Sequence, residues 1–178
     1  MAGNLLTFYV KAVYSENVVR IGATEKGIAE RAAWQANDTY QETVTLKHQA
    51  TSGVELTSTP GKTTTILGRY GSDTGAIIEE LGIPQNTNFS GNPGGFNLLN
   101  TPDNLFTELG ADGFWNKYNK PFLDAAISRG DEILMATPII EKNLYLPGSV
   151  ELTGYGREYF YLLENGYRYV NGKMILKN

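Results

Sequence analysis

The chain of 178 residues contains no cysteine and a single histidine, His48. Without cysteine it can form no disulfide, no thiolate metal site and no thiol nucleophile. One histidine supplies neither a transition-metal site of several imidazoles nor a mechanism that needs two histidines. No run of 18 or more apolar residues occurs, so we expect no membrane-spanning segment.

Familiar catalytic motifs are missing as well. The sequence has no Gly-x-Ser-x-Gly, and its glycines fit neither a phosphate-binding loop nor a dinucleotide fingerprint. Asp131 and Glu132 could supply an acid to a metal-dependent nuclease, but the Glu-x-Lys partner of such sites is missing. We therefore expect a site without metal or cofactor. The net charge of −4 disfavours nucleic-acid binding through a global positive field, although it is compatible with a local basic groove.

The first third of the chain has the pattern of a small α+β piece. Leu5–Tyr14 is rich in aromatic and β-branched residues, which predicts a strand, and Ala23–Ala36 has helical spacing of apolar residues. Gln41–Gln49 and Gly53–Ser58 predict two short strands in a hairpin. The turn signal Thr59–Lys62 then marks a candidate boundary.

The predicted domains are accordingly residues 1–59, a small piece for docking or for entering a cell, and residues 60–178, a compact domain of helices and an antiparallel sheet. The alternative is one continuous α+β fold. The elements expected in the second part are strands at Thr63–Leu67 and Glu132–Ala136, a helix capped by Ser72 or Asp73 and ended by Gly82, a long helix Asp112–Arg129 broken near Pro121, a helix from Thr153 to Leu163, and a hairpin Tyr167–Leu176 turning at Asn171-Gly172.

Polar residues gather at the ends of these elements, where loops commonly carry functional sites. Cleavage of RNA without a metal needs a base for the ribose 2′-OH, cationic donors for the phosphorane and an acid for the leaving oxygen. Arginine suits the phosphorane because its charged fork is bidentate. In this scheme Glu158 serves as the base and Tyr70 or Lys120 as the acid. The candidate catalytic residues are Arg69, Tyr70, Lys120, Thr137, Arg157 and Glu158, and the candidate substrate contacts are Asn97, Asn119 and Tyr155.

Each candidate also has a purely structural interpretation. Arg69 could form a salt bridge with Asp73, and Asn119 or Lys120 could cap the helix break at Pro121. Arg157 and Glu158 could be an exposed pair at a helix start. From the residues alone, the chain is an α+β protein with a possible site for an anionic ligand.

A succession of motifs resembles the C-terminal toxin modules of bacterial polymorphic toxins, which include contact-dependent growth inhibition proteins. The resemblance covers about Gly61–Asn178, and the stretch Phe122–Asp131 is its most specific part. The motifs that carry it are Gly68-Arg69-Tyr70, Gly94–Asp103, Phe114–Asp131, Ala136-Thr137-Pro138 and Gly156–Leu162 followed by Gly166-Tyr167.

The resemblance implies a module of a large secreted or surface protein that is delivered into the cytoplasm of a neighbouring cell. Such modules are neutralised in the producer by a cognate immunity protein, and some act with a host factor. Many are ribonucleases that cleave tRNA, which makes a metal-independent ribonuclease the leading hypothesis. Others hydrolyse NAD, in which case Arg69 would hold the pyrophosphate and Glu158 would stabilise the oxocarbenium ion. A non-enzymatic module that binds a protein partner through the loop Pro84–Asn97 is the third hypothesis.

Overall fold

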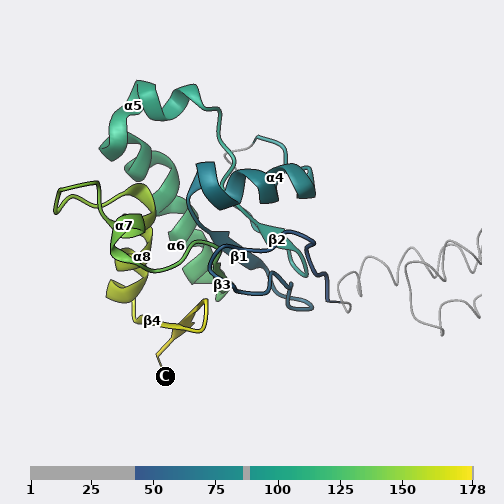
Figure 1. The fold of residues 1–178 in the computed structure, drawn as a ribbon. Helices are drawn as coiled ribbons and strands as arrows, with labels where there is room; N and C mark the ends of the chain where they lie inside the picture. The colour runs from purple at the N-terminus through teal and green to yellow at the C-terminus, as the bar shows by residue number, and fades with distance from the viewer. Residues whose placement is uncertain (1–42, 86–88, 178) are drawn as a thin grey trace, which may run out of the picture. The chain divides into compact units, whose positions relative to one another are not determined.

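The structure is a computed structural model that describes residues 43–85 and 89–177 (Figure 1). These residues belong to one compact unit, Glu42–Asn178. The strand and helix expected at Leu5–Tyr14 and Ala23–Ala36 lie outside the described residues. In the part that is described, none of the helices combines the length and the apolar composition needed to cross a membrane.

A five-stranded mixed sheet forms the centre of the unit, with strand order β2-β1-β3-β5-β4. β1 runs parallel to both β2 and β3, whereas β5 is antiparallel to both β3 and β4. The α+β class is confirmed, and the sheet that was expected to be antiparallel is half parallel. The strands are β1 (Thr64–Leu67), β2 (Phe96–Asn97), β3 (Glu132–Met135), β4 (Tyr167–Val170) and β5 (Lys173–Leu176).

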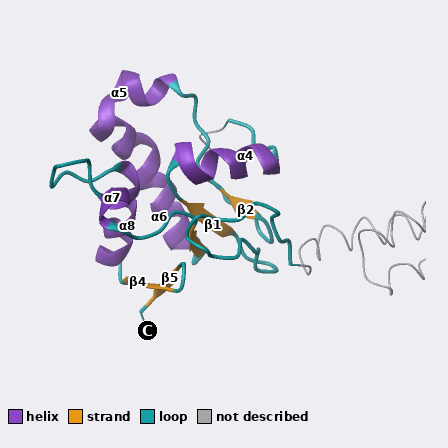
Figure 2. Cartoon of the chain, in the orientation of Figure 1, coloured by secondary structure: helices purple, strands orange, loops and turns teal. Residues whose placement is uncertain are grey.

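The helices flank the strands from different sides (Figure 2). Two of them are preceded by π-helical turns, η1 and η2, that continue directly into the helix. The helical elements are η1 (Tyr70–Thr74), α4 (Gly75–Leu81), α5 (Asn104–Phe114), η2 (Trp115–Asn119), α6 (Lys120–Arg129), α7 (Glu141–Leu144) and α8 (Gly154–Glu164).

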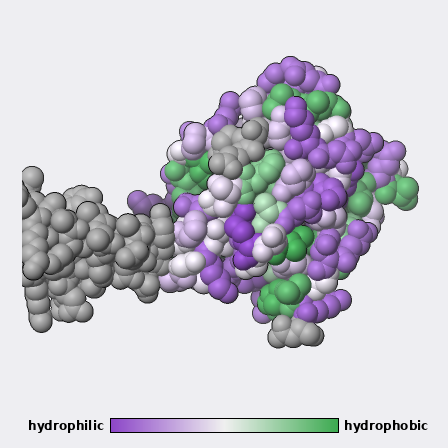
Figure 3. All heavy atoms as spheres, turned by 180° about the vertical axis from the view of Figure 1, so that it is seen from behind, coloured by the Kyte–Doolittle hydropathy of each residue, from purple (hydrophilic) through white to green (hydrophobic). Residues whose placement is uncertain are grey.

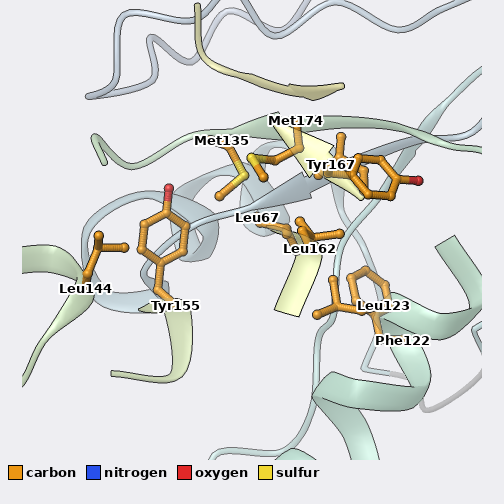
Figure 4. Packing of buried hydrophobic residues seen from close by; sticks show 10 residues of the cluster. Leu67, Phe122, Leu123, Met135, Leu144, Tyr155, Leu162, Tyr167 and Met174 are labelled. Carbon is orange, nitrogen blue, oxygen red and sulfur yellow. The ribbon is translucent and has the colours of Figure 1, made fainter. Parts of the chain in front are cut away.

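Successive residues of β1 point to opposite faces of the sheet and bury different helices. Ile66 packs in a cluster with Ile77 of α4. Leu67 packs in another cluster with Phe122 of α6 and Leu162 of α8, and Figure 4 shows these side chains gathered on that face. Because helices cover both faces of the sheet here, all four residues of β1 are buried.

The crossovers of the parallel strands create a topological switch point at the carboxyl ends of β1 and β2. The connection from β1 to β2 runs through α4 on one face, and the connection from β2 to β3 runs through α6 on the other. Since β1 and β2 are neighbours, their carboxyl ends lead the chain to opposite faces. In open α/β sheets, ligands bind at such switch points.

Residues 43–59 belong to the same packed unit. Thr45 pairs with Thr57 in an antiparallel bridge, which agrees with the expected hairpin. Ala50 and Leu56 are buried in the cluster that holds α4. The segments before and after the turn Thr59–Lys62, which was proposed as a domain boundary, therefore pack in a common core.

Several local predictions are confirmed. Asn171 has φ 48° and Gly172 φ 84°, the positive angles of the expected hairpin turn. The Thr153 side chain accepts a hydrogen bond from the Gly156 amide and caps α8. The kink or break expected at Pro121 takes the form of the π-helical turn η2, through which the backbone stays helical, because proline cannot donate the hydrogen bond of a regular α-helix.

The expected side-chain cap of the first helix is wrong. The helical turn begins at Tyr70, before Ser72 and Asp73, and Arg69 occupies the capping position without a side-chain hydrogen bond. The Asp73 carboxylate is instead bound by Thr51 and Thr137, which lie far away in the sequence.

The surface shows no single large apolar area on the face drawn in Figure 3, where hydrophobic residues lie in separate groups among hydrophilic ones. Val150 is the most exposed large hydrophobic residue of the described part, at 91%. It lies in the loop between α7 and α8.

Candidate functional site

A cavity of about 650 Å³, called the site pocket below, lies at the carboxyl ends of β1 and β2. One wall comes from Gly68–Gly71 after β1 and from Leu98–Asp103 after β2. The opposite wall comes from η2 and the first turns of α8. Its aromatic residues are Tyr70, Phe106, Phe114, Trp115, Phe122 and Tyr155, and its charged residues are Arg69, Asp103, Arg157 and Glu158.

The site pocket brings together most of the residues singled out in the sequence. From the catalytic set it holds Arg69, Tyr70, Arg157 and Glu158, and from the substrate-contact set Asn119 and Tyr155. Segments up to 89 residues apart, from Arg69 to Glu158, therefore meet at one place.

Three candidates lie elsewhere. Lys120 is bound to Asp124 at 2.8 Å on the surface of α6 and is not among the pocket-lining residues. Asn97 lines a second cavity of about 310 Å³. Thr137 is buried behind the pocket, where its carbonyl accepts a hydrogen bond from the Tyr155 hydroxyl.

Thr137 and Asp73 hold the segment after β1 in place. The Thr137 hydroxyl donates to Asp73 Oδ2 at 2.7 Å, and its oxygen accepts from the Arg69 amide at 2.9 Å. Burial alone would raise the pKa of Asp73, but hydrogen bonds donated by Thr137, Thr51 and Ser72 outweigh it and hold the pKa below its ordinary value. Asp73 is therefore a buried carboxylate that stays ionised and fixes the backbone at Arg69.

The chain approaches closely at Gly68. A Cβ atom there would lie 3.0 Å from Thr137 Oγ1 and 3.2 Å from a methyl group of Thr74. Glycine therefore allows β1 to pass directly into the helical turn beside Thr137. As a result, the continuous helix η1–α4 begins at Tyr70 on the pocket wall, with Asp73 in its first turn.

The Arg69 side chain does not form the salt bridge with Asp73 that was its structural interpretation. Its Nη1 lies 3.4 Å from Asn143 Oδ1, a neutral acceptor, and the residue is exposed at the pocket wall. Within the described part, its charge has no carboxylate partner. Arg69 is therefore a charged donor at the start of a helix, a combination suited to an anionic group.

Glu158 lies inside the first turns of α8 and is 8% exposed. Asn119 of η2 donates a hydrogen bond from Nδ2 to Glu158 Oε1 at 2.7 Å. Burial raises the pKa of Glu158 to about 8, and the Asn119 hydrogen bond only partly opposes this. At neutral pH Glu158 is thus mostly a neutral carboxylic acid, and it is not the exposed carboxylate of the structural interpretation.

Arg157 belongs to the outer wall. Its guanidinium lies 4.7 Å from the centre of the Trp115 ring and 2.8 Å from the Asp112 carboxylate. Asp112 itself is 90% exposed, so this ion pair is solvated and contributes little to stability. Arg157 can turn towards a ligand without breaking a buried interaction.

Sequence reasoning missed the role of Asp73 as the anchor of the site, and it did not single out Trp115 as a pocket residue. Asp73 gave no signal because its partners, Thr51 and Thr137, are distant in the sequence. Trp115 packs partly against the core and also lines the pocket beneath Arg157.

Comparison of the chain with protein-family models, with curated proteins and with solved structures finds no significant match. The site must therefore be interpreted from its own chemistry. In the described residues, no group of three or more His, Asp or Glu side chains is arranged to hold a metal ion.

Proposed function

We propose that this chain is a toxin-type enzyme that binds NAD in the site pocket and hydrolyses its bond to nicotinamide. The observation that carries the proposal is the placement of buried Glu158 in one pocket with Arg69 and Arg157.

The pocket has the size and lining of a small-molecule site. Its volume of about 650 Å³ falls within the range of roughly 300–1,000 Å³ that is common for such sites. Tyr70 and Trp115 supply flat apolar surfaces for rings. A polynucleotide more often binds in an open basic groove, and the acidic net charge of −4 does not favour one.

The pyrophosphate is assigned to the wall formed by Arg69 and the start of η1. Arginine provides bidentate hydrogen bonds to phosphate oxygens. Asp73 and Thr137 hold the Arg69 backbone in position before the ligand arrives.

Glu158 is assigned to the nicotinamide–ribose end of NAD, where the bond is broken. A pyridinium ring near its carboxyl group favours the ionised form, because an opposite charge within about 4–6 Å lowers the pKa of an acid. The resulting carboxylate stabilises the positive charge that develops on the ribose as the C–N bond breaks. Water adds to the ribose carbon and loses a proton, so NAD and water give nicotinamide, ADP-ribose and one proton.

The test is the loss of NAD in the presence of the purified chain, followed by fluorescence and by chromatography of nicotinamide. Glu158→Gln should abolish turnover, whereas Glu164→Gln, an exposed position at the end of the same helix, should leave it unchanged. Absence of nicotinamide release by the wild-type chain at any pH between 6 and 9 would refute the proposal.

A metal-independent ribonuclease is the second candidate. It is favoured by the exposure of Tyr70, 58%, beside Arg69, since an exposed ring at a pocket mouth can stack on a base of a longer polymer. In this case Glu158, protonated at neutral pH, would act as the acid. Discrete fragments of total RNA or tRNA in the presence of EDTA and cell extract would support this candidate over the first.

Delivery as a toxin rests on the resemblance of Gly61–Asn178 to polymorphic toxin modules. The expected partners are a cognate immunity protein and, for the ribonuclease, a factor of the target cell. Expression of the chain in a bacterium without an immunity protein should stop growth. Growth that is equal for wild type and Glu158→Gln would count against both enzymatic candidates.

A further inference from the structure

The helix α5 lines the site pocket but buries none of its own residues. Phe106 and Phe114 of this helix belong to the pocket lining, and Phe106 is 53% exposed. Figure 1 shows α5 at the outer end of the unit, apart from the sheet. A helix that carries apolar side chains and buries none of them has little tertiary packing to hold it in one position.

The chain is anchored on both sides of the first turns of α5. Before them, the buried Asn100 side chain donates a hydrogen bond to the Ile83 carbonyl at 2.7 Å. After them, Arg157 binds the Asp112 carboxylate at 2.8 Å. In the part of the chain that the structure describes, residues 102–109 form hydrogen bonds only with one another or with the rest of α5. The segment between the anchors is therefore free of fixed contacts to the body of the unit.

Gly110 gives this segment a hinge. Its φ of 66° and ψ of 175° lie outside the helical region, so a non-helical residue joins the two parts of α5. Such a backbone conformation is essentially restricted to glycine. Hinges are formed by a few residues at the ends of elements that absorb a change in backbone angles. The part of α5 before Gly110 can therefore rotate as a unit while Asp112 stays bound to Arg157.

We propose that residues 103–109 form a lid that closes over the site pocket about Gly110, and that Phe106 is a further ligand contact whose ring lies on the bound nucleotide in the closed state. This inference rests on the proposed binding of a nucleotide in the site pocket. In the open state described here, the Phe106 ring meets the Phe114 ring edge-on, with 5.5 Å between their centres. Phe106 therefore already stands beside the cavity that it would cover.

A ligand stabilises the closed position for two reasons. A nucleotide base offers the exposed Phe106 ring a flat apolar surface, and stacking on it removes both surfaces from water. Closure also excludes water from the pocket, which strengthens the electrostatic interactions of Arg69 and Glu158 with the ligand. The lid thus links binding of the nucleotide to the environment in which its bond is broken.

Hydrogen exchange of the full chain, followed by mass spectrometry, measures the motion. Without ligand, the amides of residues 104–109 should exchange at least about tenfold faster than those of α6, which has buried residues. ADP-ribose is the probe, because it lacks the bond that the proposed reaction breaks. At about 100 times its Kd it should slow exchange of residues 104–109 by about tenfold or more. The hairpin Tyr167–Leu176, which does not line the pocket, should be unchanged.

Two neighbouring substitutions test Phe106. Phe106→Ser should weaken the binding of ADP-ribose by about tenfold or more and remove the protection of residues 104–109, because it deletes the stacking ring. Thr107→Ser is the matched control, since Thr107 is exposed on the same turn and does not line the pocket. This control should keep the wild-type affinity and protection. Melting temperatures show whether both variants fold, and the exchange of the wild-type chain decides if Phe106→Ser does not.

The outcomes separate this inference from the proposed function. Protection of the lid by ADP-ribose without cleavage of NAD keeps the lid and removes the hydrolase. Cleavage of NAD with no change in the exchange of residues 104–109 keeps the hydrolase and overturns the lid.

Three further results would overturn the lid. They are failure of ADP-ribose to bind, exchange of residues 104–109 as slow as that of α6 without ligand, and equal behaviour of Phe106→Ser and Thr107→Ser. Slow exchange that depends on the concentration of the chain would assign Phe106 to a contact between two copies instead.

Discussion

The Thr137 hydroxyl donates a hydrogen bond to Asp73 Oδ2 across 2.7 Å and thereby joins the end of β3 to the helical turn that follows β1. Both side chains are almost fully buried. Since the same hydroxyl oxygen accepts from the Arg69 amide, this link places Arg69 on the pocket wall. The packing of the sheet and the geometry of the site thus depend on one short chain of hydrogen bonds.

Replacement of Asp73 by alanine should destabilise the fold and disturb the site. The change leaves the hydroxyl groups of Thr51, Ser72 and Thr137 without their acceptor. We expect a loss of about 2–4 kcal/mol in the free energy of unfolding, from hydrogen bonds to a charged group. Urea denaturation measures it, and Asp103→Ala, an exposed position, is the control.

The contribution of Asp73 should also depend on pH. Its pKa is lower in the folded state than in the unfolded chain, so the unfolded state binds the proton more readily. The stabilisation is therefore present above the unfolded pKa and is lost as the pH falls through the folded pKa. The difference in unfolding free energy between wild type and Asp73→Asn should therefore become smaller as the pH falls. A difference that stays constant from pH 2 to 6 would contradict this.

Glu158 should show the opposite dependence. Its pKa of about 8 in the fold exceeds its ordinary value, so the folded state holds the proton more tightly and becomes less stable as the pH rises towards 8. Glu158→Gln should remove this loss, on the order of 1 kcal/mol per pKa unit. Thermal melts of wild type and Glu158→Gln at pH 5 and 9 measure this loss. An equal change of melting temperature in the two proteins would show that Glu158 does not cause the loss of stability.

Hydrolysis of NAD by the wild-type chain should rise with pH. Because the proposed mechanism uses the ionised carboxylate, kcat/KM should increase as the free Glu158 loses its proton, with an inflection near pH 8. A kcat/KM that falls with rising pH in this range would point to Glu158 as an acid.

Arg69→Gln should weaken the binding of NAD by roughly 10- to 100-fold, because it removes a charged donor to phosphate. Its melting temperature should stay near that of wild type, since Arg69 is exposed and has no carboxylate partner in the described part. Arg168→Gln, on the exposed side of β4, is the control and should bind normally. Equal affinities for all three proteins would remove Arg69 from the site.

Two glycines of α8 form a matched pair for a test of packing. A Cβ at Gly156 would lie 2.0 Å from the Leu144 carbonyl oxygen, whereas a Cβ at Gly154 would meet nothing within 4 Å. Gly156→Ala should therefore force α7 and α8 apart and lower stability by about 1–3 kcal/mol or more. Gly154→Ala should be neutral within about 0.5 kcal/mol, and denaturation midpoints decide between these outcomes.

Much of the local structure was determined by the sequence. The turn at Asn171-Gly172, the Thr153 cap and the break before Pro121 follow from groups a few residues apart, which act before any tertiary contact forms. Glu132–Ala136 was recognisable as a strand by its short apolar run, and Thr63–Leu67 by its run of β-branched residues before a glycine. Six of the nine candidate site residues chosen at the element ends also proved to line the pocket.

Tertiary structure alone decided how these pieces act together. The parallel order β2-β1-β3 depends on which face each crossover covers, and no local pattern encodes that choice. The same packing leaves Lys120 on the surface of α6 and buries Glu158 in a hydrogen bond with Asn119. Glu158 was recognisable as a carboxyl group in the sequence, but its protonation depends on burial, and burial arises only when η2 and α8 pack around the carboxyl ends of β1 and β2.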